Sequence, residues 1–256
     1  MRPDVYDLRE FYHGALGRVA RNLVRHEIRR LWPEVRGQSV LGLGYATPYL
    51  RPFQGEAERV IALMPARQGI SRWPEDAANL VALTEEQELP LPDACIDRVL
   101  IVHELENSEN VRALLREAWR VLASGGRLLV VVPNRRGLWA RFERTPFGHG
   151  QPYSPGQLSG LLREAMFQPT ERSAALYLPP FRSRTLLRTA PVWERAGRGL
   201  GSTVAGVLLV EADKQIYAVT AVGAKPRRRR RPVPVALPSS GTAGRFRASA
   251  WRSPPA

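Results

Sequence analysis

The sequence is poor in the residues that build disulfide frameworks and metal centres. Its 256 residues include one cysteine, Cys95, and four histidines scattered along the chain. A single cysteine excludes an internal disulfide, and these residues offer no spacing typical of a structural zinc site. We therefore expect no bound metal, and the lone cysteine suits a cytoplasmic location.

Long apolar runs are also missing. No segment reaches the roughly 18 uninterrupted apolar residues of a membrane-spanning helix. Residues Met1–Glu10 carry acids early and lack the apolar core of a secretory signal. Hydrophobic residues still make up 44% of the chain, enough for a core in one or two domains. We expect no membrane span, while the oligomeric state stays unknown.

Acidic residues are absent from 224–256, which carries nine of the cations, including the run Arg227–Arg231. The formal net charge of the chain is +14, so residues 1–223 retain +5. Proline and small polar residues fill the rest of this segment, which we predict to be a disordered basic tail. A solubilising role is favoured, and a non-specific polyanion contact through Arg227–Arg231 is the alternative.

Residues 97–134 show the clearest structural pattern. Val99–Val102 and Leu128–Val132 are short apolar runs without alternation, typical of strands buried on both faces of a parallel sheet. Between them, apolar residues recur at helical spacing, with Ser108 as the expected N-cap and Gly125-Gly126 as the expected end. Two parallel strands joined by a helix form a βαβ unit, so the fold class is α/β.

Similar patterns predict the remaining elements. Further strands are expected over 39–43, 59–63, 80–83, 174–178 and 204–212, and helices over 8–32, 154–165 and 182–198. Pro48, Pro52 and Pro74 make the connections after the first two of these strands poor or interrupted helices. We assign residues 1–223 to one domain, with the helix 8–32 ahead of a sheet core over 38–212, and residues 224–256 to the tail.

The chain resembles the class I S-adenosylmethionine-dependent methyltransferases of the small type 11 group. The resemblance rests on Leu89–Asp93 followed by Ile96–Val99, on Glu117–Gly126, and more loosely on Phe147–Phe167. It implies a Rossmann-like, doubly wound, mostly parallel seven-stranded sheet flanked by helices. It also implies S-adenosylmethionine as cofactor.

The motif that would hold this cofactor departs from the family pattern. Gly42 stands where the family has an acid at the end of the first strand, and Gly44 keeps the first glycine. Ala46 and Pro48 replace the next two glycines, and Pro48 removes an amide donor. On this resemblance the cofactor-binding residues are Gly42, Gly44, Tyr45, Ala46, Met64, Glu85, Glu86 and His103.

The second strand shows a further departure. Met64 and Pro65 occupy the place of the acid that holds the ribose hydroxyls, and neither can accept those hydrogen bonds. Losing a charged acceptor costs about 1.5–3 kcal/mol per hydrogen bond, so we expect weakened binding. Glu85 or Glu86 stands where the family places the acid near the adenine; a solvated acidic loop is the equal alternative.

Candidate reacting groups are few. His103 follows the fourth strand and could act as a general base, although a histidine that only lines the pocket is the simpler interpretation. His149 and Tyr153 lie in a Gly/Pro-rich loop that could cover the site. His13 belongs to an N-terminal helix that could fold over it.

These features predict an S-adenosylmethionine-dependent methyltransferase acting on an unidentified acceptor, most simply a small molecule. Gly42, Pro48 and Met64 favour the alternative of a methyltransferase-fold pseudoenzyme acting as a binding or regulatory module. A third hypothesis, a nucleic-acid methyltransferase, is favoured only by Arg227–Arg231.

Overall fold

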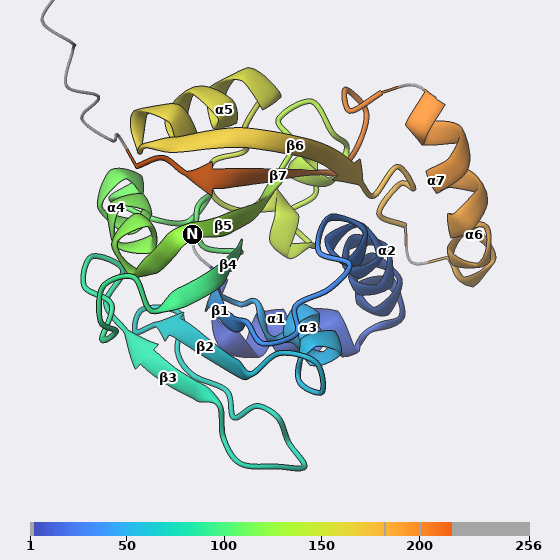
Figure 1. Ribbon diagram of the computed structural model, residues 1–256. Helices are drawn as coiled ribbons and strands as arrows, with labels where there is room; N and C mark the ends of the chain where they lie inside the picture. The colour runs from blue at the N-terminus through green and yellow to red at the C-terminus, as the bar shows by residue number, and fades with distance from the viewer. Residues whose placement is uncertain (1–2, 182, 200, 217–256) are drawn as a thin grey trace, which may run out of the picture. The chain divides into compact units, whose positions relative to one another are not determined.

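A single sheet organises the chain, and its strands lie between helices on both sides (Figure 1). The computed structural model describes residues 3–181, 183–199 and 201–216. The strand order is β3-β2-β1-β4-β5-β7-β6, with β7 antiparallel to both of its neighbours and the β3-to-β5 part parallel. The strands are β1 (Ser39–Gly44), β2 (Arg59–Pro65), β3 (Val81–Thr84), β4 (Ile96–Val102), β5 (Leu122–Pro133), β6 (Phe167–Ala175) and β7 (Val207–Lys214).

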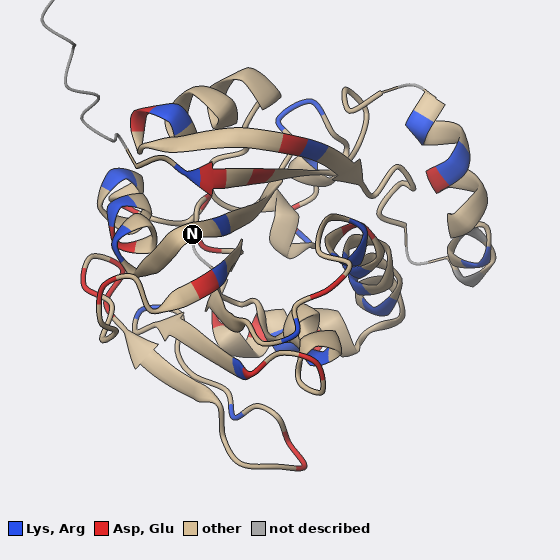
Figure 2. Cartoon of the chain, viewed as in Figure 1, with Lys and Arg blue, Asp and Glu red and all other residues tan. Residues whose placement is uncertain are grey.

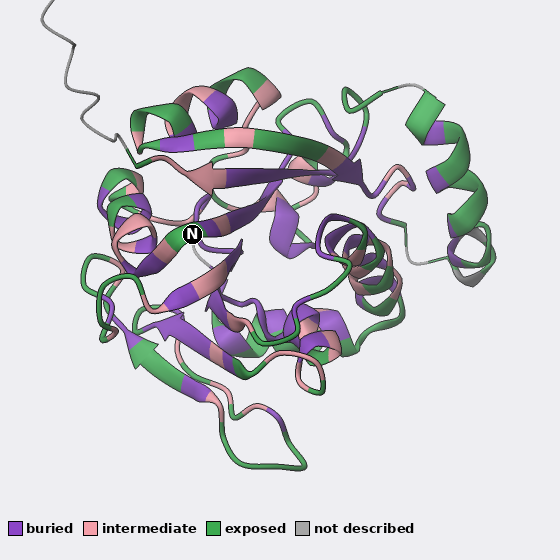
Figure 3. Ribbon diagram, in the orientation of Figure 1, coloured by how far each residue is buried: buried purple, intermediate pink, exposed green. Residues whose placement is uncertain are grey.

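Helices cover both faces of this sheet. They are α1 (Val5–His13), α2 (Ala15–Leu31), α3 (Thr47–Leu50), α4 (Val111–Val121), α5 (Pro155–Glu164), α6 (Arg184–Arg188) and α7 (Ala190–Gly199), with 3-10 turns η1 (Arg51–Phe53), η2 (Trp139–Arg141) and η3 (Pro146–Gly148). Leu100 and Val102 point into the core shared with α1, α2 and α3, whereas Val99 and Ile101 point into the core shared with α4 and α5. Burial on both faces explains the apolar runs without alternation (Figure 3).

The expected helix 8–32 is instead two helices that meet at Gly14. Gly14 has extended backbone angles, φ −66° and ψ 161°, and its N–H closes the end of α1. The chain then turns back tightly, since a Cβ on Gly17 would lie 1.9 Å from the carbonyl oxygen of Phe11. The two glycines therefore allow α1 to leave the line of α2 and pack elsewhere on the sheet.

Three other boundaries differ from expectation. Asn110, not Ser108, caps α4, because its Oδ1 accepts from the N–H of Ala113 at 3.1 Å. That helix ends at Val121 and not at Gly125-Gly126, since Leu122 is already extended and pairs with Ile96 of β4. The strand expected over 174–178 is β6, which runs over 167–175 and is an edge strand with exposed polar residues on one face. In addition, no helix forms between β2 and β3.

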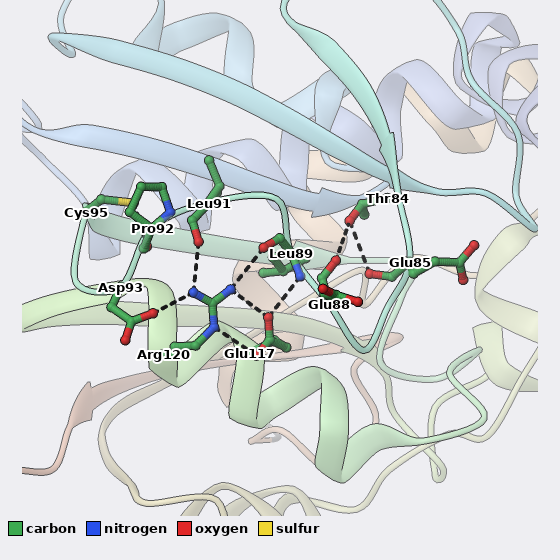
Figure 4. A network of polar contacts seen from close by, with 10 residues as sticks. All are labelled: Thr84, Glu85, Glu88, Leu89, Leu91, Pro92, Asp93, Cys95, Glu117 and Arg120. Carbon is green, nitrogen blue, oxygen red and sulfur yellow. Dashed lines mark hydrogen bonds and ion pairs between the residues drawn. The ribbon is translucent and has the colours of Figure 1, made fainter.

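The loop ahead of β4, which carries the family-like run Leu89–Asp93, is fixed to α4 by Arg120 (Figure 4). The Arg120 guanidinium donates to the carbonyls of Leu89 and Leu91 at 2.9 and 2.8 Å and to Asp93 at 2.7 Å. Glu117 accepts from Arg120 at 2.7 Å and from the Leu89 N–H at 2.9 Å. The hydrogen bond from Arg120 holds the pKa of Glu117 below its ordinary value. These family-like residues thus stabilise the framework.

The carboxyl ends of β1 and β4 lie side by side where the strand order reverses, the usual ligand position in such sheets. Helix α1 runs over this edge and is tied to the turn after β2, where the Val5 N–H donates to the Gln68 carbonyl at 2.9 Å. Among the described residues, no helix is long and apolar enough to cross a membrane. The predicted tail, 224–256, and its boundary lie outside the described residues.

Candidate functional site

The end of β1 is closely packed. Gly42 lies in the middle of the sheet, where a Cβ would meet Leu50 Cδ1 at 2.7 Å and Ala46 Cβ at 2.8 Å. An acid therefore has no room at Gly42 in this packing. Gly44 has φ +76°, and a Cβ there would lie 2.4 Å from the carbonyl oxygen of Val102. Gly44 is required because the turn passes directly against β4.

The two residues after Gly44 are buried rather than open to a ligand. Ala46 is fully buried and Tyr45 is 5% exposed. The Tyr45 N–H donates to the Val102 carbonyl at 2.9 Å, and its ring stacks on Tyr12 of α1 with centroids 5.8 Å apart. Burial raises the pKa of Tyr45 to about 12. Tyr12 of α1 thus covers the residues that would line a cofactor pocket here.

The ends of β2 and β3 supply no buried acid. Met64 is fully buried in the core beneath α1 and α2. Glu85 is exposed, and Glu86 accepts from the Ser108 hydroxyl at 2.7 Å. Gln68, in the turn after β2, is 2% exposed, and its side-chain amide has no hydrogen-bond partner among the described residues. Gln68 is therefore the polar side chain nearest in sequence to Met64 that is both buried and unsatisfied.

His103 forms the centre of a buried hydrogen-bond chain. It follows β4 with φ +55° and is 1% exposed. Its Nε2 lies 2.7 Å from the Tyr12 hydroxyl, and its Nδ1 lies 3.2 Å from Glu106 Oε1. The Tyr12 hydroxyl also lies 2.8 Å from the Tyr49 hydroxyl. Burial raises the pKa of both tyrosines, so both hydroxyls stay protonated near pH 7. Both ring nitrogens of His103 are engaged.

The other two candidate reacting groups lie apart from His103. His149 lines a hollow of about 730 Å³ between the α1–α2 turn and the loop around η3. His103 does not line this hollow, and its ring lies against that of Phe147, which follows the lining residue Pro146, with centroids 4.8 Å apart. The Tyr153 hydroxyl donates to the Leu105 carbonyl at 3.4 Å, and burial raises the pKa of Tyr153. The structure brings Tyr153 to the β4 side of the edge and His149 to the surface hollow.

The carboxyl ends of β1 and β2 lack the groups that the family uses to hold S-adenosylmethionine. The two positions where the family carries acids are Gly42, which packs against Leu50 and Ala46, and Met64, which is buried in the core. The stacked rings of Tyr12 and Tyr45 cover the turn after β1. In this conformation the residues do not fit the cofactor. Gln68 is the one buried amide at this edge that lacks a partner within the described part of the chain.

Sequence reasoning missed the partners of His103. Tyr12 follows Val5 and Leu8 on one face of α1, a spacing that predicts burial but not the strand it meets. Tyr12 lies 91 positions from His103 and Tyr49 lies 37 from Tyr12, so only the folded chain reveals these two partners. Glu106, in contrast, is three positions from His103 and is close to it in the sequence itself.

Comparisons with known proteins agree with this architecture. Residues 41–130 match the family model described as a methyltransferase domain. This match is to the type 11 methyltransferase family model. The matched segment begins in β1 and ends in β5, so it includes the place between β1 and β4 where the strand order reverses and the loop held by Arg120.

Solved structures show the same fold around this methyltransferase domain. A SAM-dependent methyltransferase of Thermotoga maritima is 17% identical with a TM-score of 0.56, covering 82% of this chain and 96% of its own. One from Archaeoglobus fulgidus is 22% identical with a TM-score of 0.51, covering 76% and 94%. The 1,6-didemethyltoxoflavin-N1-methyltransferase of Burkholderia thailandensis, with S-adenosylhomocysteine bound, is 16% identical with a TM-score of 0.50, covering 79% of each chain. No curated protein matches the chain.

Proposed function

We propose that this protein is a methyltransferase that uses S-adenosylmethionine and acts on a small molecule. The observation that carries the proposal is the match of residues 41–130 to the methyltransferase domain, on a sheet with the strand order 3-2-1-4-5-7-6. A neighbour with this fold has S-adenosylhomocysteine bound. Binding at the equivalent edge here requires α1 to move, because Tyr12 of α1 stacks on the buried Tyr45 directly after β1.

We further propose that the acceptor occupies the hollow lined by His149. Its volume, about 730 Å³, lies within the range of about 300–1,000 Å³ usual for small-molecule sites. Phe11 and Phe147 form an edge-to-face pair 6.3 Å apart, and Phe147 in turn contacts the His103 ring. A displacement of α1 that uncovers the strand edge would therefore also move Phe11 and open the hollow toward His103.

A second function is a binding or regulatory module without turnover. Met64, Gly42 and the filled edge favour it, because the family's two acids are missing together. The fold alone does not decide the chemistry, since the [4+2]-cyclase SpnF shares it, with 19% identity and a TM-score of 0.50.

Calorimetric titration of the full chain with S-adenosylmethionine and S-adenosylhomocysteine separates the two functions. We expect micromolar to millimolar binding of both, weakened by the missing acids. Absence of heat and of a shift in melting temperature with either compound, at millimolar concentration, contradicts the methyltransferase proposal and leaves the binding module. Methyl transfer is then followed with labelled cofactor on panels of amine, hydroxyl and thiol acceptors.

The location and the tail remain proposals as well. We propose a cytoplasmic protein whose residues 224–256 form a basic extension outside the domain 1–223. If Arg227–Arg231 bind nucleic acid by counterion release, binding is sequence-independent and weakens steeply with salt. Removal of 224–256 should abolish it. Sequence-selective binding that survives the truncation would instead favour a nucleic-acid methyltransferase.

A further inference from the structure

A second hollow, of about 350 Å³, lies beside the end of β1 and is dominated by arginines. Its lining includes Arg21 and Arg25 of α2, Trp73 in the loop after β2, and Tyr45 after β1. The full lining also includes Arg9, Arg51 and Arg72 against only two acids, Glu75 and Asp76. Figure 2 shows the repeated basic bands along α2.

The two acids of the hollow pair with other arginines and do not neutralise Arg21 and Arg25. Glu75 pairs with Arg9 at 2.9 Å, and Asp76 lies 4.0 Å from Arg51. Among the described residues, neither Arg21 nor Arg25 has a carboxylate partner, and the Nε atom of each is buried without an acceptor. Arg25 makes one hydrogen bond, from Nη2 to the Pro48 carbonyl at 2.7 Å. Two arginines one helical turn apart thus line the hollow without a carboxylate partner among the described residues.

This crowding has an energetic cost that a ligand could remove. Burial lowers the pKa of Arg25, and the charges of Arg21 and Arg51 lower it further. An anion between these groups would offset the repulsion, and phosphate matches the guanidinium fork with two parallel hydrogen bonds. The indole of Trp73, which is partly buried against the core and lines the hollow, offers an apolar surface for a flat ring next to that anion.

We propose that this hollow binds a phosphate-bearing small molecule with a flat ring, of the nucleotide class, with Arg21 and Arg25 on the phosphate and Trp73 on the ring. The concave shape and volume suit a small ligand rather than the extended backbone of a nucleic acid. The three residues that carry this inference, Arg21, Arg25 and Trp73, lie outside the S-adenosylmethionine site expected from the family, although the hollow also borders Tyr45 of that site.

The experiment measures thermal shift and calorimetric affinity of the full chain for inorganic phosphate, AMP and adenosine. AMP should bind more tightly than either phosphate or adenosine, because its phosphate contacts Arg21 and Arg25 while its ring contacts Trp73. Arg21→Gln should weaken AMP binding about tenfold or more, the usual effect of losing a hydrogen-bonded charge. It should leave the melting temperature of the free protein unchanged or raised, since Arg21 has no partner to lose. Trp73→Leu should weaken AMP but not phosphate.

Arg36→Gln is the matched control, since Arg36 is 82% exposed and lies outside the hollow. It should leave AMP affinity unchanged. Absence of any AMP effect at millimolar concentration overturns the proposal, as does equal affinity for AMP and adenosine. An equal loss in Arg21→Gln and Arg36→Gln would reveal only a general response to net charge. Tighter binding of a single-stranded oligonucleotide than of AMP, if lost in Arg21→Gln, would assign the hollow to nucleic acid instead.

Discussion

The loop ahead of β4 and the carboxyl edge of β1, β2 and β4 belong to the same sheet but use polar residues differently. In the loop, Arg120 satisfies the carbonyls of Leu89 and Leu91 and pairs with Glu117. At the edge, Met64 is buried among apolar residues, and the Gln68 amide has no partner in the described part of the chain. The framework keeps the family's residues, whereas at the ends of β1 and β2 the family's acids are replaced by Gly42 and the buried Met64. The fold and its chemistry therefore depend on separate sets of residues.

The largest effect should come from Met64→Asp, which puts a carboxylate at a fully buried position. We expect a loss of about 3 kcal/mol or more in the free energy of unfolding, because an unpaired charge is expensive to bury. Urea denaturation measures it. Met64→Leu, the volume-conserving control, should cost less than about 1.5 kcal/mol.

The same variant tests the position of the cofactor. If residue 64 faces the ribose when α1 moves, saturating S-adenosylmethionine should raise the melting temperature of Met64→Asp more than that of the wild type. A variant as stable as the wild type without cofactor would show that the edge is open in solution.

Arg120→Ala should have the next largest effect, because it leaves Glu117 and two loop carbonyls without their charged donor. We expect a loss of about 2–3 kcal/mol. Arg112→Ala is the control on the same helix, since both members of its pair with Glu164 are exposed, at 79% and 61%. That variant should cost less than about 1 kcal/mol. Equal losses would mean that the Arg120 network adds nothing beyond an ordinary surface pair.

Tyr12→Phe should have a smaller effect on stability and a larger one on binding. It keeps the ring against Tyr45 and removes the hydroxyl shared with His103 and Tyr49. We expect a loss of about 1–1.5 kcal/mol in the free energy of unfolding. If α1 must lift, S-adenosylmethionine should bind up to about tenfold more tightly, because the open state is populated more often. Tyr6→Phe on the same helix, 75% exposed, should change neither quantity.

The smallest expected effect is the pH dependence of the Glu117 contribution. The hydrogen bond from Arg120 lowers the pKa of Glu117 in the folded state, so the unfolded chain takes up a proton there first as the pH falls. This contribution is full above the unfolded pKa of about 4.3 and is lost as the pH falls through the folded value. The difference in unfolding free energy between wild type and Glu117→Gln should therefore shrink on acidification from pH 7 to pH 3. A constant difference would assign the effect to packing.

The sequence by itself determined the α/β class, five of the seven strands to within a few residues of each end, and the Ser154-capped helix α5. Buried parallel strands and capping boxes are local patterns, so periodicity and single residues reveal them. It misplaced β6, expected over 174–178 and found at 167–175, because an edge strand with one solvated face lacks that apolar run.

Only the tertiary structure decided what lies over the carboxyl edge. Gly14 and Gly17 allow α1 to turn away from α2, and Tyr12 then meets His103, a residue 91 positions away. The arginines of α2 likewise meet the loop that carries Trp73 through folding alone. Contacts between residues far apart in the chain depend on how helices pack across the sheet, and no local pattern in the sequence encodes that choice.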